Sequence, residues 1–280
     1  MNFREDIEYK EIRYDETPAK RGEYWQIGKG LQAPDNLPTS KYLDEIIEDI
    51  SSGKYDTKSG YTKLAEHYNS KALSEADFAT LEGDLVTARI AELLESFSFT
   101  MSPSTLMGIH RRLFEDIPSL IEYRPGKLRT SNFSKEEPVL NGESVSYADH
   151  GTILDNWRYD FEQEKTYRYS IPFKEADLTN LANFTVRIWG THGFYEGNTR
   201  TVAVFLILYL RSMGIEADNS YFKEFSNYFR DALVRSSFTN IAKGVFAEPK
   251  YLGFFFENIL WAAGHDLSKQ DLSCSELLDK

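Results

Sequence analysis

The sequence predicts an all-α protein that carries one small β-hairpin. Apolar residues recur at spacings of three and four, which places them on one helix face, as in the set Val86, Ile90, Leu93 and Phe97. The stretch Val202 to Leu210 is apolar throughout, as expected of a central helix covered on every side. The exception is Pro138 to Val145, where Asn141-Gly142 between short apolar flanks indicates a tight hairpin.

Two parts are expected, an N-terminal helical arm over residues 1–74 and a core over residues 75–280. The arm begins with polar residues up to about residue 38, where Pro18, Pro34 and Pro38 act as breakers, and we expect it to be irregular with at most one short helix. Short helices should follow from Tyr42 and over 60–70. The arm has too few apolar residues to fold alone, so we expect it to dock on the core.

Within the core, helix boundaries come from caps and apolar stripes. Ser102-Pro103 is typical of an N-cap followed by proline at the first helical position. A stripe from Leu178 to Trp189 predicts a helix that ends shortly before His192. The remaining helices of the core are expected over three ranges: 148–165, 220–236 and 248–264.

Composition narrows the function. The 44 acidic and 32 basic side chains give a formal net charge of −12, which disfavours general binding to nucleic acids or anionic membranes, although a local basic pocket could hold a nucleotide. The single Cys274 excludes an internal disulfide and fits a reducing cytoplasm. Met1 to Lys10 lacks an apolar core, so no signal peptide is expected, and no apolar run is long enough for a membrane span. We expect a soluble, cytoplasmic protein.

No zinc site is expected. The histidines outside the segment described next show no metal-ligand spacing with one another or with Cys274: His67, His110, His150 and His265.

The segment from His192 to Arg200 carries the chemistry. It lies between a helix that ends near Gly190 and a buried helix that begins after Gly197. Unpaired N–H groups at the start of a helix bind phosphate oxygens, and Arg200 could add a charge-assisted fork. Glu196 could ligate Mg²⁺, and His192 could accept a proton. These parts suit phosphoryl or nucleotidyl transfer to a hydroxyl.

The same segment resembles the motif of the Fic family, within the Fic/Doc superfamily: His-Pro-Phe-x-Asp/Glu-Gly-Asn-Gly-Arg-x-x-Arg. The residues in register are His192, Phe194, Glu196, Gly197, Asn198 and Arg200. Flanking segments also resemble bacterial members, over 109–114, 123–129 and 228–235, so that the resemblance covers roughly residues 75–265. It implies the Fic fold, a helical bundle with a central helix–loop–helix active site and a hairpin flap.

The resemblance implies an adenylyltransferase that moves AMP from ATP to a Ser, Thr or Tyr hydroxyl of a target protein, with itself as one possible target. His192 would be the base and Glu196 would hold Mg²⁺. Gly197, Asn198 and the amides that follow, Thr199 included, would form the anion hole beside Arg200. Tyr228 is a candidate neighbour of the adenine or ribose, with core packing as the other interpretation.

The target is expected to dock on the flap at residues 138–146, where Lys135 and Tyr147 could meet target or nucleotide. The sequence does not predict the oligomeric state, and a homodimer is one option.

The sequence departs from the family pattern in three places. Gly193 replaces a proline, which loosens the loop, and Thr199 replaces a glycine against the phosphates. Ala203 stands at the second arginine, which is associated with the γ-phosphate. Arg200-Thr201 also resembles the Doc branch, whose members are kinases. Phosphate transfer and a catalytically weak binding protein therefore stay open beside AMP transfer.

Fic proteins often carry an inhibitory Ser/Thr-x-x-x-Glu-Gly/Asn helix that holds the second arginine. Two segments resemble it in part, Leu31-x-x-x-Asp35-Asn36 in the arm and Phe78-x-x-x-Glu82-Gly83. The simpler interpretation of Glu82-Gly83 is a helix start. Because Ala203 removes the arginine, we expect a glutamate here to have no partner and the protein not to be held off by such a pair.

Overall fold

The computed structural model describes residues 17–70, 73–95, 99–117 and 124–278. Met1 to Lys10, Phe97 and Tyr123, which entered the predictions above, lie outside these ranges. Within them the chain is mainly helical and forms no β-strand, with one isolated antiparallel bridge between Asn240 and Val245. None of the helices in these ranges combines the length and the hydropathy that crossing a membrane requires.

From residue 17 onward the first part of the arm is more regular than expected, with one α-helix followed by a 3₁₀ turn in place of a mainly irregular segment. Helix α1 (Pro18–Gly30) starts at Pro18, and the Thr17 side chain caps it by accepting a bond from the Lys20 N–H (3.3 Å). Proline is tolerated at a first helical position because its missing N–H would have no partner there. Pro34 lies in a 3₁₀ turn, η1 (Ala33–Asp35).

The two other predicted helices of the arm are confirmed. Helix α2 (Lys41–Ser51) is capped by the Ser40 side chain, and helix α3 (Thr57–Asn69) by that of Asp56.

The helices of the core agree with the apolar stripes, and the α-helices among them are α4 (Glu75–Glu95), α5 (Pro103–Phe114), α6 (Ile153–Thr166), α7 (Glu175–Gly190), α8 (Asn198–Ser212), α9 (Ser220–Glu224), α10 (Ser226–Ser237), α11 (Lys250–Trp261) and α12 (Ser275–Leu278). Short 3₁₀ turns are η3 (Pro138–Leu140), η4 (His150–Thr152), η5 (Ile241–Lys243) and η6 (Leu267–Lys269). The one helix expected over 220–236 is divided at Phe225, whose backbone is not helical.

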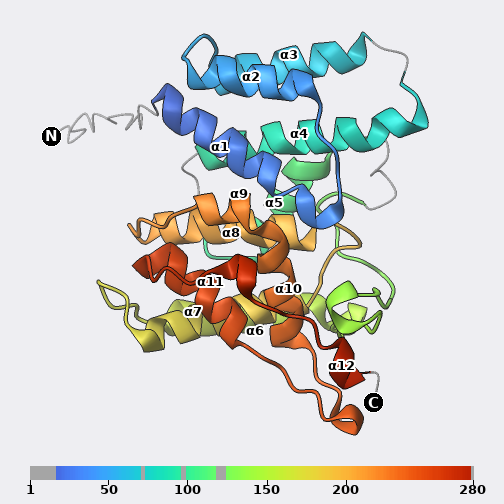
Figure 1. The fold of residues 1–280 in the computed structure, drawn as a ribbon, viewed down its shortest axis with the longest axis vertical. Helices are drawn as coiled ribbons and strands as arrows, with labels where there is room; N and C mark the ends of the chain where they lie inside the picture. The colour runs from blue at the N-terminus through green and yellow to red at the C-terminus, as the bar shows by residue number, and fades with distance from the viewer. Residues whose placement is uncertain (1–16, 71–72, 96–98, 118–123, 279–280) are drawn as a thin grey trace, which may run out of the picture.

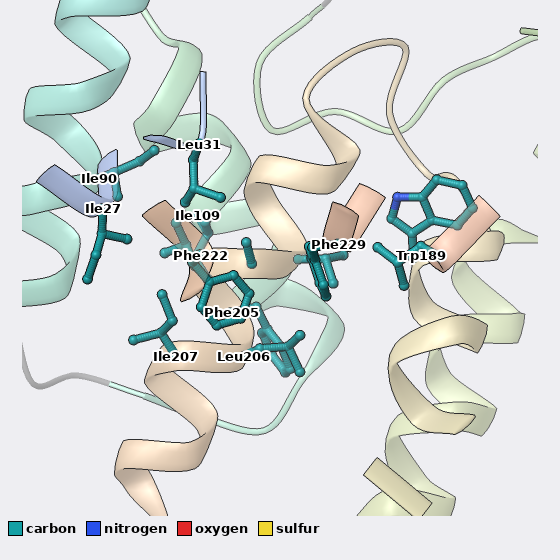
Figure 2. Close-up of a cluster of buried hydrophobic side chains, with 14 of the residues drawn as sticks. Ile27, Leu31, Ile90, Ile109, Trp189, Phe205, Leu206, Ile207, Phe222 and Phe229 are labelled. Carbon is teal, nitrogen blue, oxygen red and sulfur yellow. The ribbon is translucent and has the colours of Figure 1, made fainter. Parts of the chain in front are cut away.

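Helix α8 lies in the middle of the molecule, with the arm towards one end of the long axis and α6, α7 and α11 towards the other (Figure 1). Its residues from Arg200 to Leu210 are buried, as the apolar run predicts. Ile27 of α1 and Leu31 at its C-cap share the surrounding core with Phe205 of α8 and Phe222 of α9 (Figure 2). The arm therefore docks on the core through a continuous apolar interior.

The predicted hairpin is a turn without strands. Asn141 and Gly142 both have positive φ (53° and 86°), and the Glu143 N–H donates to the Leu140 carbonyl (3.1 Å), which is the tight turn that Asn-Gly favours. The flanks do not pair as a ladder because Pro138 begins η3 and lacks an N–H, and the Lys135 N–H donates to the Ser144 hydroxyl instead. The flap at 138–146 is thus a compact loop.

Candidate active site

The α7–α8 loop holds His192 in a conformation that L-residues rarely adopt, with φ at 50°. Hydrogen bonds fix it from both sides: its N–H donates to the Trp189 carbonyl (2.9 Å), and its own carbonyl accepts from Arg129 Nε (2.7 Å). The Arg129 N–H also donates to the Gly193 carbonyl (2.9 Å). Backbone strain that the surroundings maintain in this way is typical of functional sites.

Two glycines in the loop are required by close packing. A Cβ on Gly193 would lie 2.3 Å from the Trp157 ring, whose Nε1–H is fixed on the Ile188 carbonyl (3.1 Å). A Cβ on Gly197, where φ is 74°, would lie 2.3 Å from the Phe114 ring. Gly193 therefore does more than loosen the loop: Trp157 fills the space that a proline ring would need.

Hydrogen bonds of the buried Asn198 and His110 side chains stabilise the loop. The Asn198 side chain accepts from the Phe194 N–H (3.1 Å) and donates to the Phe194 carbonyl (2.8 Å). His110 stacks on the Phe194 ring at 3.8 Å. Its Nδ1 accepts from the Gly126 N–H (2.8 Å), so its Nε2 carries the proton and donates to the Glu196 carbonyl (3.0 Å). Burial lowers the pKa of His110 to about 4, so it is neutral and structural.

Arg200 is the group whose partners sequence reasoning missed. Its side chain is 1% exposed and lies over the Phe114 ring at 4.8 Å. Its Nε is 2.9 Å from an Asp35 carboxylate oxygen, and Nη1 donates to Glu82 (3.1 Å) and to the Gln32 side chain (3.2 Å). The expectation that Glu82 has no arginine to hold is wrong: both partial inhibitory segments reach Arg200.

Burial of Glu82 raises its pKa, and Arg200 works against that shift. Keeping the buried Glu82 carboxylate charged therefore costs free energy, and Arg200 is the cation that stabilises its charged form. Arg200 Nη2 is buried and makes no hydrogen bond to any described residue.

A cavity of about 390 Å³ opens beside Arg200. Its charged lining combines the basic groups Lys135, Arg200 and Arg230 with the acidic groups Asp35, Glu82, Glu136 and Glu196.

Glu196 is the candidate ligand for Mg²⁺ in this cavity. One oxygen of the carboxylate accepts from the Gly197 N–H (2.9 Å) at the start of α8. Mg²⁺ is commonly bound by one or two carboxylates together with substrate phosphates, and a single carboxylate beside an arginine and a helix N-terminus fits that pattern. Among the described residues no group of three or more His, Cys, Asp or Glu side chains could form a metal cage by themselves.

His192 is shut away from this cavity. His192 is 5% exposed, and the Tyr147 ring stacks on its imidazole with the ring centroids 3.9 Å apart. The rings of Phe133 and Trp189 meet it edge-on at 5.6 and 5.5 Å. Its Nδ1 is buried and has no hydrogen-bond partner among the described residues, and burial lowers its pKa to about 3. The imidazole is neutral, as a base must be, yet it is covered.

Of the remaining residues that the sequence predicted for the site, only some lie at the cavity beside Arg200. The Thr199 hydroxyl accepts from Trp189 Nε1 (3.0 Å), and Ala203 is fully buried in α8. Lys135 lines the cavity. Tyr228 does not line it, because its hydroxyl donates to the Tyr251 carbonyl (3.0 Å). A contact of Tyr228 with nucleotide stays a prediction.

Comparisons with known proteins support the fold described above. Residues 100–210 match the model of the Fic/DOC family. The crystal structure of the N-terminal FIC domain of Bep8, a VirB-translocated effector protein from Bartonella sp. 1-1C, is similar with a TM-score of 0.50 and 18% sequence identity, covering 68% of this chain and 88% of that one. No curated protein matches. The chain therefore has the all-α Fic fold, and its segment 100–210 is the part that matches the Fic/DOC family.

Proposed function

We propose that the cavity beside Arg200 binds ATP and that the protein transfers AMP to a Ser, Thr or Tyr hydroxyl of a target protein. The observation that carries the proposal is the buried Arg200 guanidinium at the start of α8, where two carboxylates, Asp35 and Glu82, stand in for phosphate oxygens. An arginine and a helix N-terminus are the groups that bind phosphates elsewhere.

His192 is the proposed base. The target hydroxyl would attack the α-phosphorus while its proton passes to the imidazole, and the bond from that phosphorus to pyrophosphate would break. Glu196 would hold Mg²⁺, which when bound neutralises phosphate charge. The amides of the N-cap Gly197 and of Asn198 and Thr199 in α8 would bind phosphate oxygens. The Asn198 side chain would keep those amides in place through its two bonds to Phe194.

The described conformation is a closed one. The cavity lining holds four carboxylates against three basic side chains, so a polyanionic triphosphate would have to displace at least one of Asp35 and Glu82 from Arg200 before binding well. The base would also have to be uncovered. The loop at 138–146 is proposed to receive the target protein, because it lies between the cavity, through Pro138, and the Tyr147 ring that covers His192.

Intact-mass measurement after incubation with ATP and Mg²⁺ tests the reaction. A gain of one AMP, lost in His192→Ala and kept in His265→Ala, would support AMP transfer. His265 is a half-buried histidine in the segment after α11 and pairs with Glu257. A gain of one phosphate would replace the proposal with the kinase alternative.

No mass change combined with no ATP binding by calorimetry would favour a catalytically weak binding protein. Calorimetry on Asp35→Ala in parallel keeps the test from failing only because the wild-type cavity is closed.

A further inference from the structure

The Tyr147 ring separates His192 from a second cavity. This cavity, of about 530 Å³, is lined by Tyr147, Gly190 and Thr191, together with Asn156, Tyr159 and Ser237 from neighbouring helices. His192 follows Thr191 directly in the chain but does not line the cavity, because the Tyr147 ring is stacked on the imidazole at 3.9 Å. Of the three aromatic rings that contact the imidazole, Tyr147 is the one that also lines this cavity.

An ion pair holds the ring in place. The Tyr147 hydroxyl donates to Glu137 (3.3 Å), and Glu137, which is 1% exposed, pairs with Arg230 of α10. Burial raises the pKa of Tyr147 and of Glu137, so the hydroxyl remains the donor and the carboxylate depends on Arg230 to stay charged. Arg230 also contacts Asp231 (3.3 Å).

Arg230 joins this arrangement to the cavity beside Arg200, because it is one of the three basic side chains that line it. An anion in that cavity would compete with Glu137 for the Arg230 guanidinium. If Arg230 turns to the anion, Glu137 is left as a buried carboxylate without its cation, which is strongly unfavourable, and it must move or take up a proton. Either change alters the hydrogen bond that the Tyr147 hydroxyl makes to Glu137.

We propose that Tyr147 is a cover over His192, held by Glu137 and Arg230, and that a phosphate-bearing ligand beside Arg200 releases it through Arg230. The cover opens His192 onto the 530 Å³ cavity, which would then receive the acceptor side chain. This inference rests on the proposed function only for the identity of the ligand and of the acceptor. The contacts that make the cover do not depend on it.

Carbethoxylation of histidines by diethyl pyrocarbonate, followed by peptide mass spectrometry, tests the cover without any transfer reaction. His192 should react slowly in the wild type, whereas His150, whose side chain is 43% exposed, reports the rate of an open histidine. Tyr147→Ala should raise the rate of modification at His192 about tenfold or more, because the free energy of an aromatic contact of this kind corresponds to about that ratio of rates. Tyr147→Phe should keep the rate low, because the ring is retained.

Two controls separate uncovering from unfolding. His110 is 1% exposed and should stay unreactive in every variant that remains folded. Tyr159→Ala removes an exposed tyrosine from the same cavity without touching the imidazole, and should leave the His192 rate unchanged. A His192 rate in Tyr147→Ala equal to that of the wild type, with His110 protected, would overturn the cover.

Pyrophosphate with Mg²⁺ tests the link through Arg230. It should speed the reaction of His192 in the wild type several-fold and have no such effect in Arg230→Gln. Bound pyrophosphate that leaves His192 as slow as before would refute the link while the transfer proposal stands. Failure of pyrophosphate to bind at all, checked by calorimetry on the wild type and on Asp35→Ala, would refute the link and also remove the proposed donor site.

Discussion

Replacement of Asp35 by alanine should make the protein bind ATP more tightly. In the wild type the Arg200 guanidinium is 1% exposed and holds carboxylates from Asp35 and Glu82. A triphosphate must displace at least one of them, and a hydrogen bond to a charged group contributes about 1.5–3 kcal/mol. Asp35→Ala removes that competition, while Glu82 and Gln32 keep Arg200 partnered. The expected gain in affinity is therefore about 10- to 100-fold.

Isothermal titration of ATP in the presence of Mg²⁺ measures the effect. Glu48→Ala is the matched control, because Glu48 is an exposed carboxylate of α2 in the same arm and its loss changes the net charge equally. Intact-mass assays on the same variants report whether AMP transfer rises together with affinity. The opposite change, Arg200→Ala, should abolish the tight binding gained by Asp35→Ala.

Equal ATP affinities for the wild type, Asp35→Ala and Glu48→Ala would refute this reasoning. That result would mean that the Asp35–Arg200 contact does not compete with phosphate, and that the nucleotide binds elsewhere or not at all. Increased affinity of the Glu48→Ala control as well would assign the gain to overall charge rather than to this contact.

Three further predictions concern the loop and its supports. Gly193→Ala should destabilise the fold by about 1–3 kcal/mol in chemical denaturation, because its Cβ meets the Trp157 ring, whereas Gly253→Ala on the open side of α11 should be neutral or stabilising by up to about 1 kcal/mol. The pKa of His110 is about 4 in the folded protein and about 6.5 in the unfolded chain, so the unfolded chain takes up the proton first and stability falls as pH drops below about 6.5. Between pH 7 and 5 the wild type should lose about 2 kcal/mol more of its free energy of unfolding than His110→Gln. The same pH dependence in both proteins would contradict this prediction. Glu196→Gln should remove most of the difference between ATP affinities measured with Mg²⁺ and with a chelator, and an unchanged difference would place the metal elsewhere.

Local patterns predicted the helices but not their long-range partners. The stripe that ends at Trp189 and the apolar run after Arg200 are local signals, and α7 and α8 follow them. Pro18 was misinterpreted because a proline that starts a helix and one that breaks it look alike in a sequence. Asn141-Gly142 correctly indicated the turn, yet strand pairing failed because it depends on flanks that Pro138 diverts into η3.

The sequence identified candidate site residues but could not show which side chains Arg200 contacts in the folded protein. His192 and Glu196 lie on the loop between α7 and α8, and Arg200 lies in the first turn of α8. Asp35 and Glu82 reach Arg200 from segments more than a hundred residues away, and no periodicity or spacing encodes such a meeting. The partial motifs around them were the available signal, but the missing second arginine led to the conclusion that they had nothing to bind.

The fit between Gly193 and Trp157 has a consequence for how this loop can change over evolutionary time. A proline at position 193 would collide with the indole, so the change at 193 is accessible only after position 157 has accepted a smaller side chain. Conversely, a bulky residue at 157 could arise only once 193 was already a glycine. The two positions should therefore be exchanged in a fixed order, and the double replacement of Trp157 by leucine and Gly193 by proline should be tolerated better than Gly193→Pro alone.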